Sequence, residues 1–326
     1  MGHGHYSAAA HAALMAGRAH LSGTEVFVQR QCHPLMNPKG LKVRECRDSA
    51  DHPESIGIAF ALDVTGSMGD IPHLLATREL PNFMKLLNAC GVAHPEVMFM
   101  AIGDATSDQA PLQVGQFEST AQLMDQWLTW SYLEGGGGGS NHESYDLAFY
   151  IAAQHTDMDN WVKRKKKGYL FLTGDELPYP AVSRIQIEAL IGEKLDEDIP
   201  LEEVIAAAAE TYHLFFLIPD LVRGKRCEAR WRELLGNHCI CMESPADTCA
   251  VAAAIVGLTE NLIADTAAVG EILSRNGFDR EHVGSTIRAV QEYAALLKTP
   301  SSKPRYATSA KPSGKWWKRL FENDSA

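Results

Sequence analysis

Short apolar runs alternate with longer segments of helical periodicity along most of this chain. The runs that indicate strands cover residues 56–62, 97–102, 168–172, 212–218 and 239–242. Strands buried on both faces have this continuous apolar character, and they occur in parallel sheets that helices cover on each side. The pattern therefore predicts an α/β protein with a doubly wound, mostly parallel central sheet of Rossmann-like type, flanked by helices.

The segments between these runs place apolar residues three and four positions apart, which is the spacing of one helix face. They cover residues 71–89, 117–126, 143–154, 185–191, 201–210, 228–235 and 246–262. Pro81 is expected to bend or restart the first helix, because proline has no backbone N–H to donate. Residues 127–133 are expected to form a short strand.

Changes in composition divide the chain into four expected regions. Residues 1–50 form an N-terminal extension that packs on the sheet domain, which covers residues 51–264. Residues 265–298 form a helical extension. Residues 299–326 begin with Ser, Pro and Lys and end with basic and aromatic side chains, which predicts a flexible tail.

The overall charge indicates which partners to expect, and the cysteines indicate the cellular compartment. The 326 residues include 30 Lys and Arg against 41 Asp and Glu, a net charge of −11, so no nucleic acid is expected as a partner. Seven widely spaced cysteines indicate reduced thiols and a cytoplasmic location. Cys239 and Cys241 would share one strand face, where they could bind zinc or be ordinary thiols. No apolar segment approaches the roughly 18 residues that would cross a bilayer.

A carboxylate and two hydroxyls follow the first apolar run directly, at Asp63, Thr65 and Ser67. In α/β sheets, ligands bind beyond the carboxyl ends of the strands, where the strand order reverses. Hard oxygen ligands of this kind suit Mg²⁺, which takes few protein ligands and keeps several waters. In the alternative reading, Asp63 only caps the following helix and Ser67 is a turn residue.

The sequence Asp-x-Thr-Gly-Ser-Met-Gly after a first strand resembles the metal-ion-dependent adhesion site of von Willebrand factor type A domains. The first loop of that family reads Asp-x-Ser-x-Ser, so Thr65 keeps the hydroxyl of the first serine. The resemblance covers residues 56–262 and includes the order of elements, with a glycine-rich loop before the central helix. It implies an intracellular member of the family with Mg²⁺ or Mn²⁺ bound by Asp63, Thr65 and Ser67.

The family supplies a threonine from a second loop, which here spans residues 134–144 and has none. The residues that could replace it are Ser140, Asn141, Glu143 and Ser144. The distance to the following helix favours Glu143. A plain flexible loop is the alternative, because glycine runs are easily tolerated on a surface.

The family's third loop supplies an aspartate after a strand, and its counterpart here is Asp175, shifted by one residue. Asp175 and Glu176 could instead form a solvated loop. Asp104 and Asp108 follow the second strand and are expected on the same rim, where they could support the site, contact a partner or form an ordinary polar loop.

The resemblance implies a metal-dependent adaptor rather than an enzyme. An exposed acidic residue of a protein partner would complete the coordination of the ion, and related intracellular domains work beside ATPases or kinases. One alternative is a metal-dependent phosphate hydrolase, with Asp63, Asp175 and Glu143 around the ion and His142 as its base. Another is a structural protein that keeps the fold without the metal.

Two further segments carry concentrated charge. The tail interleaves Trp316 and Trp317 with basic residues, and a partner groove, an anionic membrane surface or the body of the protein could cover these side chains. Residues 163–167 are all basic and are expected to form a solvated turn.

Overall fold

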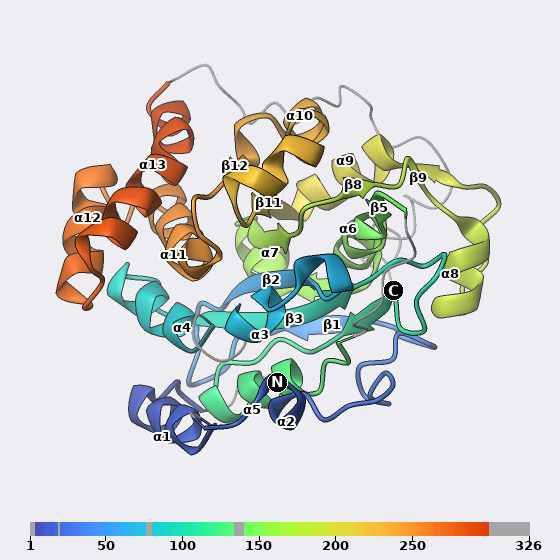
Figure 1. Ribbon diagram of the computed structural model, residues 1–326, viewed down its shortest axis with the longest axis horizontal. Helices are drawn as coiled ribbons and strands as arrows, with labels where there is room; N and C mark the ends of the chain where they lie inside the picture. Colours follow the sequence, from blue (N-terminus) through green and yellow to red (C-terminus); the bar gives the residue numbers. More distant parts are fainter. Residues whose placement is uncertain (1–3, 19, 76–79, 134–139, 300–326) are drawn as a thin grey trace.

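The central sheet has six strands in the order β12-β11-β7-β2-β3-β4 in a computed structural model, which describes residues 4–18, 20–75, 80–133 and 140–299. The strands are β2 (Ile56–Asp63), β3 (Pro95–Ile102), β4 (Leu112–Val114), β7 (Gly168–Thr173), β11 (Tyr212–Ile218) and β12 (Cys239–Cys241). All neighbours are parallel except β3 and β4. The predicted fold class, a mostly parallel α/β sheet flanked by helices, is confirmed (Figure 1).

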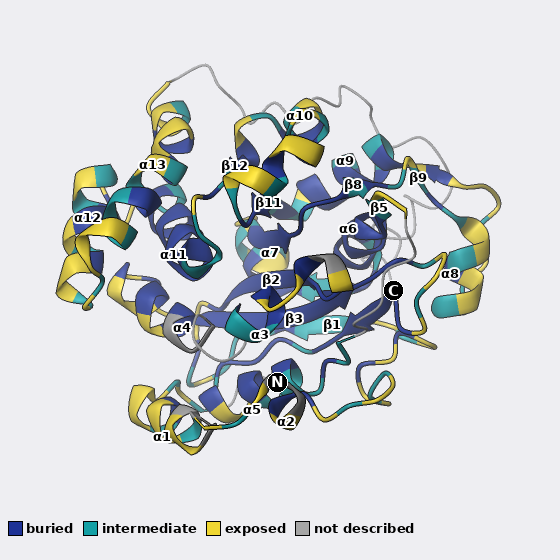
Figure 2. Cartoon of the chain, in the orientation of Figure 1, coloured by how far each residue is buried: buried dark blue, intermediate teal, exposed yellow. Residues whose placement is uncertain are grey.

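Side chains of β2 alternate between two buried layers, because successive residues of a strand point to opposite faces. Ile58 and Phe60 join one layer, and Ala59 and Ala61 join the other. The first layer lies under α4 (Leu80–Ala89), α5 (Ala121–Thr129), α11 (Thr248–Thr259), α12 (Thr266–Arg275) and α13 (Arg280–Leu297). The second lies under α6 (Tyr145–Gln154), α9 (Leu201–Thr211) and α10 (Leu221–Leu235). Figure 2 shows the sheet buried between helices, of which α6 and α11 are themselves largely buried while α10, α12 and α13 expose one face.

The predicted strand over residues 127–133 is wrong. Its first three residues belong to α5, which begins after Thr120, whose hydroxyl accepts a hydrogen bond from the backbone N–H of Leu123. Met124 and Leu128 are both buried and lie four residues apart, so the apolar face continues with helical spacing. Helix α5 therefore begins and ends later than the predicted helix 117–126.

Other helices also differ from their predicted limits, and α11 begins two residues later and ends three residues earlier than the predicted 246–262. Glu143 lies in the two-residue strand β5 (His142–Glu143), which pairs with β8 (Leu177–Pro178), so the helix after it begins only at Tyr145. Helix α10 begins seven residues before the predicted 228, because Asp220 caps its first turn through the N–H groups of Val222 and Arg223. Residues 71–89 contain α3 (Ile71–Leu74) and α4, and residues 76–79 between them lie outside the described residues.

The described residues among the first fifty include two short helices and a strand. Helix α1 (Ala8–Arg18) contacts α5 and α4, and α2 (Gly23–Val26) follows it. Strand β1 (Arg44–Cys46) pairs in parallel with β6 (Thr156–Met158). This segment therefore packs against the rest of the chain, while the limits of the four expected regions stay predictions.

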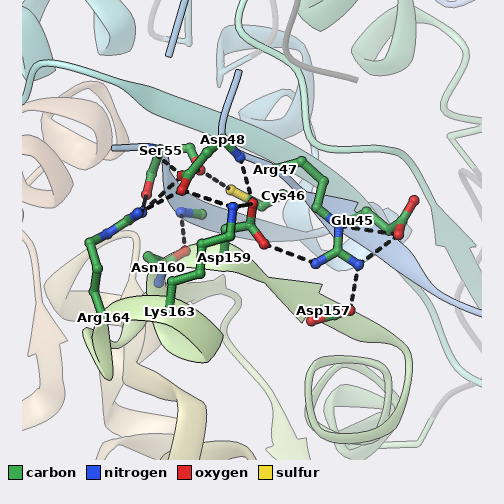
Figure 3. Close-up of polar contacts among 11 residues, drawn as sticks. Glu45, Cys46, Arg47, Asp48, Ser55, Asp157, Asp159, Asn160, Lys163 and Arg164 are labelled. Carbon is green, nitrogen blue, oxygen red and sulfur yellow. Dashed lines mark hydrogen bonds and ion pairs between the residues drawn. The ribbon is translucent and has the colours of Figure 1, made fainter. Parts of the chain in front are cut away.

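Ion pairs join the segment after β1 to α7 (Asp159–Arg164), as Figure 3 shows. Both oxygens of Asp48 accept hydrogen bonds from Arg164, at 2.8 and 3.0 Å. Asp159 accepts from Arg47 at 3.1 Å and from Lys163 at 2.7 Å. The basic run 163–167 therefore contributes ion pairs as well as a turn, and Lys165 makes that turn with a left-handed backbone.

The other elements of the described residues are short: α8 (Arg184–Leu190), β9 (Ala181–Val182), which pairs with β10 (Ile199–Pro200), and the 3₁₀ turns Gly66–Met68, Gly236–His238 and Pro245–Asp247. All seven cysteines are free thiols. Within the described residues, no helix combines the length and the apolar character that a membrane crossing requires. The tail with Trp316 and Trp317 lies outside the described residues.

Candidate metal centre

Asp63 ends β2 at the point where the strand order reverses. The next strand along the chain, β3, pairs with one side of β2, and the later strand β7 pairs with the other. The register places Leu62 beside Thr173 of β7 and Asp63 beside Ile102 of β3. The loops after these strands therefore meet around Asp63, as expected for a ligand site in a doubly wound sheet.

Both carboxylate oxygens of Asp63 accept hydrogen bonds. The Thr65 hydroxyl donates to Oδ1 at 2.6 Å, the backbone N–H of Thr65 donates to the same oxygen at 3.0 Å, and the Tyr145 hydroxyl donates to Oδ2 at 2.6 Å. Burial raises the pKa of Asp63 to about 6, although these hydrogen bonds lower it; the charge of Asp175 raises it further. Asp63 is therefore a buried, firmly oriented carboxylate whose negative charge is only partly balanced.

Glu143 reaches the same place from the second loop. It is buried, and no described residue gives a hydrogen bond to its Oε2. Burial raises the pKa of Glu143 to about 9, and the charges of Asp63, Asp104 and Asp108 add to the shift, while the Thr65 hydroxyl partly offsets it. A buried carboxylate oxygen without a donor is costly, so a ligand that supplies positive charge would stabilise Glu143.

Asp175, the predicted ligand of the third loop, has an ion pair that the sequence analysis did not anticipate. Its fully buried carboxylate lies 2.6 Å from Nη1 of Arg223 on α10. The preceding residue, Gly174, lies against Tyr145, and a Cβ there would be 2.0 Å from the tyrosine hydroxyl oxygen. Tyr145 therefore separates the third loop from Asp63, and Asp175 faces the positive charge of Arg223.

Of the two predicted serine ligands, Ser140 and Ser67, the structure describes the side chain of Ser140 only. Ser140 donates to Oδ2 of Asp104 at 3.1 Å and to the carbonyl oxygen of His142 at 2.9 Å, so it shapes the second loop. Ser67 lies in the 3₁₀ turn Gly66–Met68, and its side chain lies outside the described part of the structure. Asp104 also accepts from Tyr179 at 2.9 Å, so it supports the loops on the rim.

Asp146 adds a further buried acid on the first turn of α6. It is fully buried, and neither of its carboxylate oxygens has a hydrogen-bond partner among the described residues. Burial raises the pKa of Asp146 to about 8, and the charge of Asp104 contributes. Asp146 is thus a further acidic group near Asp104, in addition to the acidic residues that the sequence indicated.

The donors around Asp63 suit a hard divalent cation. Two buried carboxylates, Asp63 and Glu143, lie with the Thr65 hydroxyl, and one oxygen of Glu143 is unpartnered. Oxygen donors and incompletely balanced negative charge are what Mg²⁺ and Mn²⁺ require. The residues present therefore fit the metal that the family resemblance implies.

Acidic, histidine and cysteine side chains do not form a metal site by themselves in the described residues. No group of three or more of them is arranged to hold an ion there, including the region of Cys239 and Cys241. Among the described residues, Cys239 and Cys241 therefore have no third acidic, histidine or cysteine side chain with which to bind zinc. A site at Asp63 depends on hydroxyl ligands in addition to its carboxylates.

Sequence spacing missed Tyr145 and Arg223, the two residues that hold the predicted aspartates. Tyr145 is the first residue of α6, so an aromatic hydroxyl directly after the second loop is a usable signal. Arg223 is the third residue of α10 and lies 48 positions from Asp175. No local pattern connects these two positions.

Comparisons with known proteins identify no family by sequence: no family model matches this chain, and neither does any curated protein. Similar solved structures include the pilus adhesin SpaC from Lactobacillus rhamnosus GG, with 12% identity over 69% of this chain and 33% of that one and a TM-score of 0.42. The vWF domain of the type V pili tip protein Mfa5 from Porphyromonas gingivalis has 11% identity over 68% of this chain and 96% of that one, with a TM-score of 0.36.

A third similar structure is proximal thread matrix protein 1 from the mussel byssus. It has 8% identity over 65% of this chain and 47% of that one, with a TM-score of 0.37. The chain spans less than half the length of this protein and of SpaC. The fold class rests on the strand order and the helix layers described above.

Proposed function

We propose that this chain is a von Willebrand A-like interaction module that binds Mg²⁺ or Mn²⁺ at Asp63 and, with the metal bound, an acidic group of a protein partner. The observation that carries the proposal is the buried, partly balanced pair of carboxylates, Asp63 and Glu143, at the reversal of strand order. A cation bound there would favour the ionised form of both groups, because burial and the charge of Asp63 raise the pKa of Glu143 to about 9 when no cation balances them.

Each residue has a separate part in this function. Asp63, Thr65, Ser67 and Glu143 would hold the ion, while Tyr145 orients Asp63 through its hydroxyl. Asp104 fixes the second loop by accepting from Ser140 and Tyr179. When bound, the ion supplies a positive centre that a partner's carboxylate can approach. Binding of the partner would then depend on metal, as in a switchable adaptor.

Water proton relaxation tests whether a carboxylate reaches the ion. Mn²⁺ shortens the relaxation time of the water it coordinates, so Mn²⁺ bound to the full chain should enhance relaxation. A short peptide with one glutamate should reduce this enhancement by displacing water, whereas the same peptide with glutamine should not. Equal effects of the two peptides would contradict carboxylate recognition.

The same samples distinguish the two alternative functions. Metal-dependent hydrolysis of a generic phosphate ester that Asp63→Ala abolishes would identify a hydrolase instead. Asp196→Asn is a matched control, because Asp196 is an exposed aspartate outside the loops that form the site. Absence of Mn²⁺ binding by the unmodified chain would leave the structural role.

A further inference from the structure

Arg223 places a permanent positive charge beside one of the three carboxylates predicted to bind the ion. Its Nη1 lies 2.6 Å from Oδ2 of Asp175, whose side chain is fully buried. A guanidinium stays charged at all physiological pH values. The ion pair is therefore a constant feature of the site, whether or not an ion is bound.

The position of Arg223 is fixed by its own helix. Its Nε lies 2.9 Å from Oδ2 of Asp220, and Oδ1 of Asp220 accepts from the backbone N–H of Arg223 at 2.9 Å. The guanidinium thus bridges Asp175 on one side and the N-cap of α10 on the other. A lysine has no such fork, so it could not hold both carboxylates in this arrangement.

The charges around the site determine what such a bridge does. Asp63, Glu143 and Asp175 carry three negative charges when ionised, and Arg223 offsets one of them. Asp175 stays close to the site, because the preceding Gly174 lies against Tyr145, whose hydroxyl donates to Oδ2 of Asp63 at 2.6 Å. The net negative charge around Asp63 therefore depends on how completely Arg223 neutralises Asp175.

We propose that Arg223 is a positioning residue that limits the divalent-cation affinity of this site: it neutralises Asp175 and holds it away from direct coordination. The ion is then held by Asp63, Thr65, Ser67 and Glu143. This inference rests on the proposed function, and it explains why an aspartate at the family's position need not act as a ligand here. Weak affinity makes occupancy responsive to the metal concentration and to a partner's added carboxylate.

The test is the affinity of the full chain for Mn²⁺, measured from the electron paramagnetic resonance signal of free Mn²⁺. Arg223→Met should bind Mn²⁺ about tenfold more tightly, because a positive charge close to a divalent ion is removed. Adding Asp175→Asn to Arg223→Met should bring the affinity back to within about threefold of the unmodified chain. Arg223→Lys keeps the positive charge but cannot bridge the two carboxylates. Its Mn²⁺ affinity should lie between those of the unmodified chain and Arg223→Met.

Two further variants serve as a replacement for Arg223→Met and as a control. Arg223→Gln can still donate a hydrogen bond to Asp175 and carries the same prediction if Arg223→Met fails to fold. Arg226→Met is the matched control, because Arg226 lies on the same helix and pairs with Glu176 at 3.4 Å, yet its side chain is 63% exposed. Its Mn²⁺ affinity should stay within about twofold of the unmodified chain.

The outcomes separate this inference from the proposed function. If the unmodified chain binds Mn²⁺ and folded Arg223→Met and Arg223→Gln bind it no more tightly, the inference fails and the proposed function stands. If only the Arg223 variants bind, the inference is supported and the proposed function of the natural chain fails. If no variant binds, both fail.

Discussion

Tyr145 donates a hydrogen bond of 2.6 Å to Oδ2 of Asp63, and neither residue is more than 1% exposed. The contact joins the first residue of α6 to the last residue of β2, so it fixes the helix after the glycine-rich loop against the central strand. It also gives the buried Asp63 carboxylate a donor on the side away from Thr65. The orientation of the candidate site therefore depends on a side chain that is not itself a predicted ligand.

Tyr145→Phe should lower the free energy of unfolding by about 2 kcal/mol, because it leaves a buried carboxylate oxygen without its donor. Urea unfolding measures this change. Tyr212→Phe is a matched control: Tyr212 is as deeply buried, but its hydroxyl donates to the neutral Thr156 hydroxyl at 2.9 Å. Its loss should be about 1 kcal/mol. A larger loss for Tyr212→Phe would contradict the special role of Tyr145.

Thr65→Val should weaken Mn²⁺ binding by about tenfold, since it removes a hydroxyl ligand while preserving the shape of the side chain. Thr65→Ser keeps the hydroxyl and should change the dissociation constant by less than about threefold. Titration with Mn²⁺ under the same conditions compares the two variants. Equal affinities of the valine and serine variants would show that the hydroxyl takes no part in binding.

Asp48→Asn should destabilise the fold by about 2 kcal/mol, because Asp48 accepts from Arg164, Ser55 and Lys163 in a largely shielded position. Glu271→Gln is the control. Glu271 pairs with Arg275 in the open, where both side chains are at least 66% exposed, and it should cost less than about 0.5 kcal/mol. Chemical denaturation at neutral pH compares them, and equal losses would contradict the role of the network.

The Asp48 network should also show a defined pH dependence. Although burial raises the pKa of Asp48, hydrogen bonds from Arg164, Ser55 and Lys163 outweigh this and hold it well below its usual range. Its stabilising contribution is therefore complete above about pH 4, the pKa of the unfolded chain, and declines as pH falls below that value. The stability difference between Asp48→Asn and the unmodified chain should shrink in the same range.

His238 should make the protein less stable as pH falls from about 6.5 to about 4. Burial lowers the pKa of His238 to about 4, whereas the unfolded chain protonates near 6.5. Between these values the unfolded state binds the extra proton, so stability decreases by up to about 1.4 kcal/mol per pH unit. His238→Gln should flatten the dependence in urea unfolding, and His20→Gln, at an exposed position, should leave it unchanged. An identical slope for His238→Gln would exclude this cause.

Five strands of the central sheet and the edge that holds the site could be predicted from the sequence, because burial on both faces leaves a continuous apolar run, whereas the short strand β4 was not predicted. Strand β11 (Tyr212–Ile218) has the limits that its apolar residues indicate. The short strand expected over 127–133 failed because Trp127 and Leu128 suit both strand and helix. In a helix, Met124 and Leu128 lie on the same face because they are four residues apart, and both are buried.

The site shows a similar division. Asp63 and Thr65 follow from one loop of consecutive residues, and Glu143 follows from its distance to the next helix. The ion pair of Asp175 with Arg223 and the hydrogen bond from Tyr145 could not be predicted, because they join residues 48 and 82 positions apart. Such contacts depend on how the strands are ordered in space, which local spacing does not encode.

The central claim is that a divalent cation binds at Asp63, and calorimetric titration of the chelator-treated full chain with Mg²⁺ and Mn²⁺ tests it most directly. The unmodified chain should bind about one ion, and Asp63→Asn should weaken binding by at least about tenfold. Asp196→Asn should bind like the unmodified chain. Absence of binding by the unmodified chain at millimolar metal, or equal affinity in Asp63→Asn, would contradict the account.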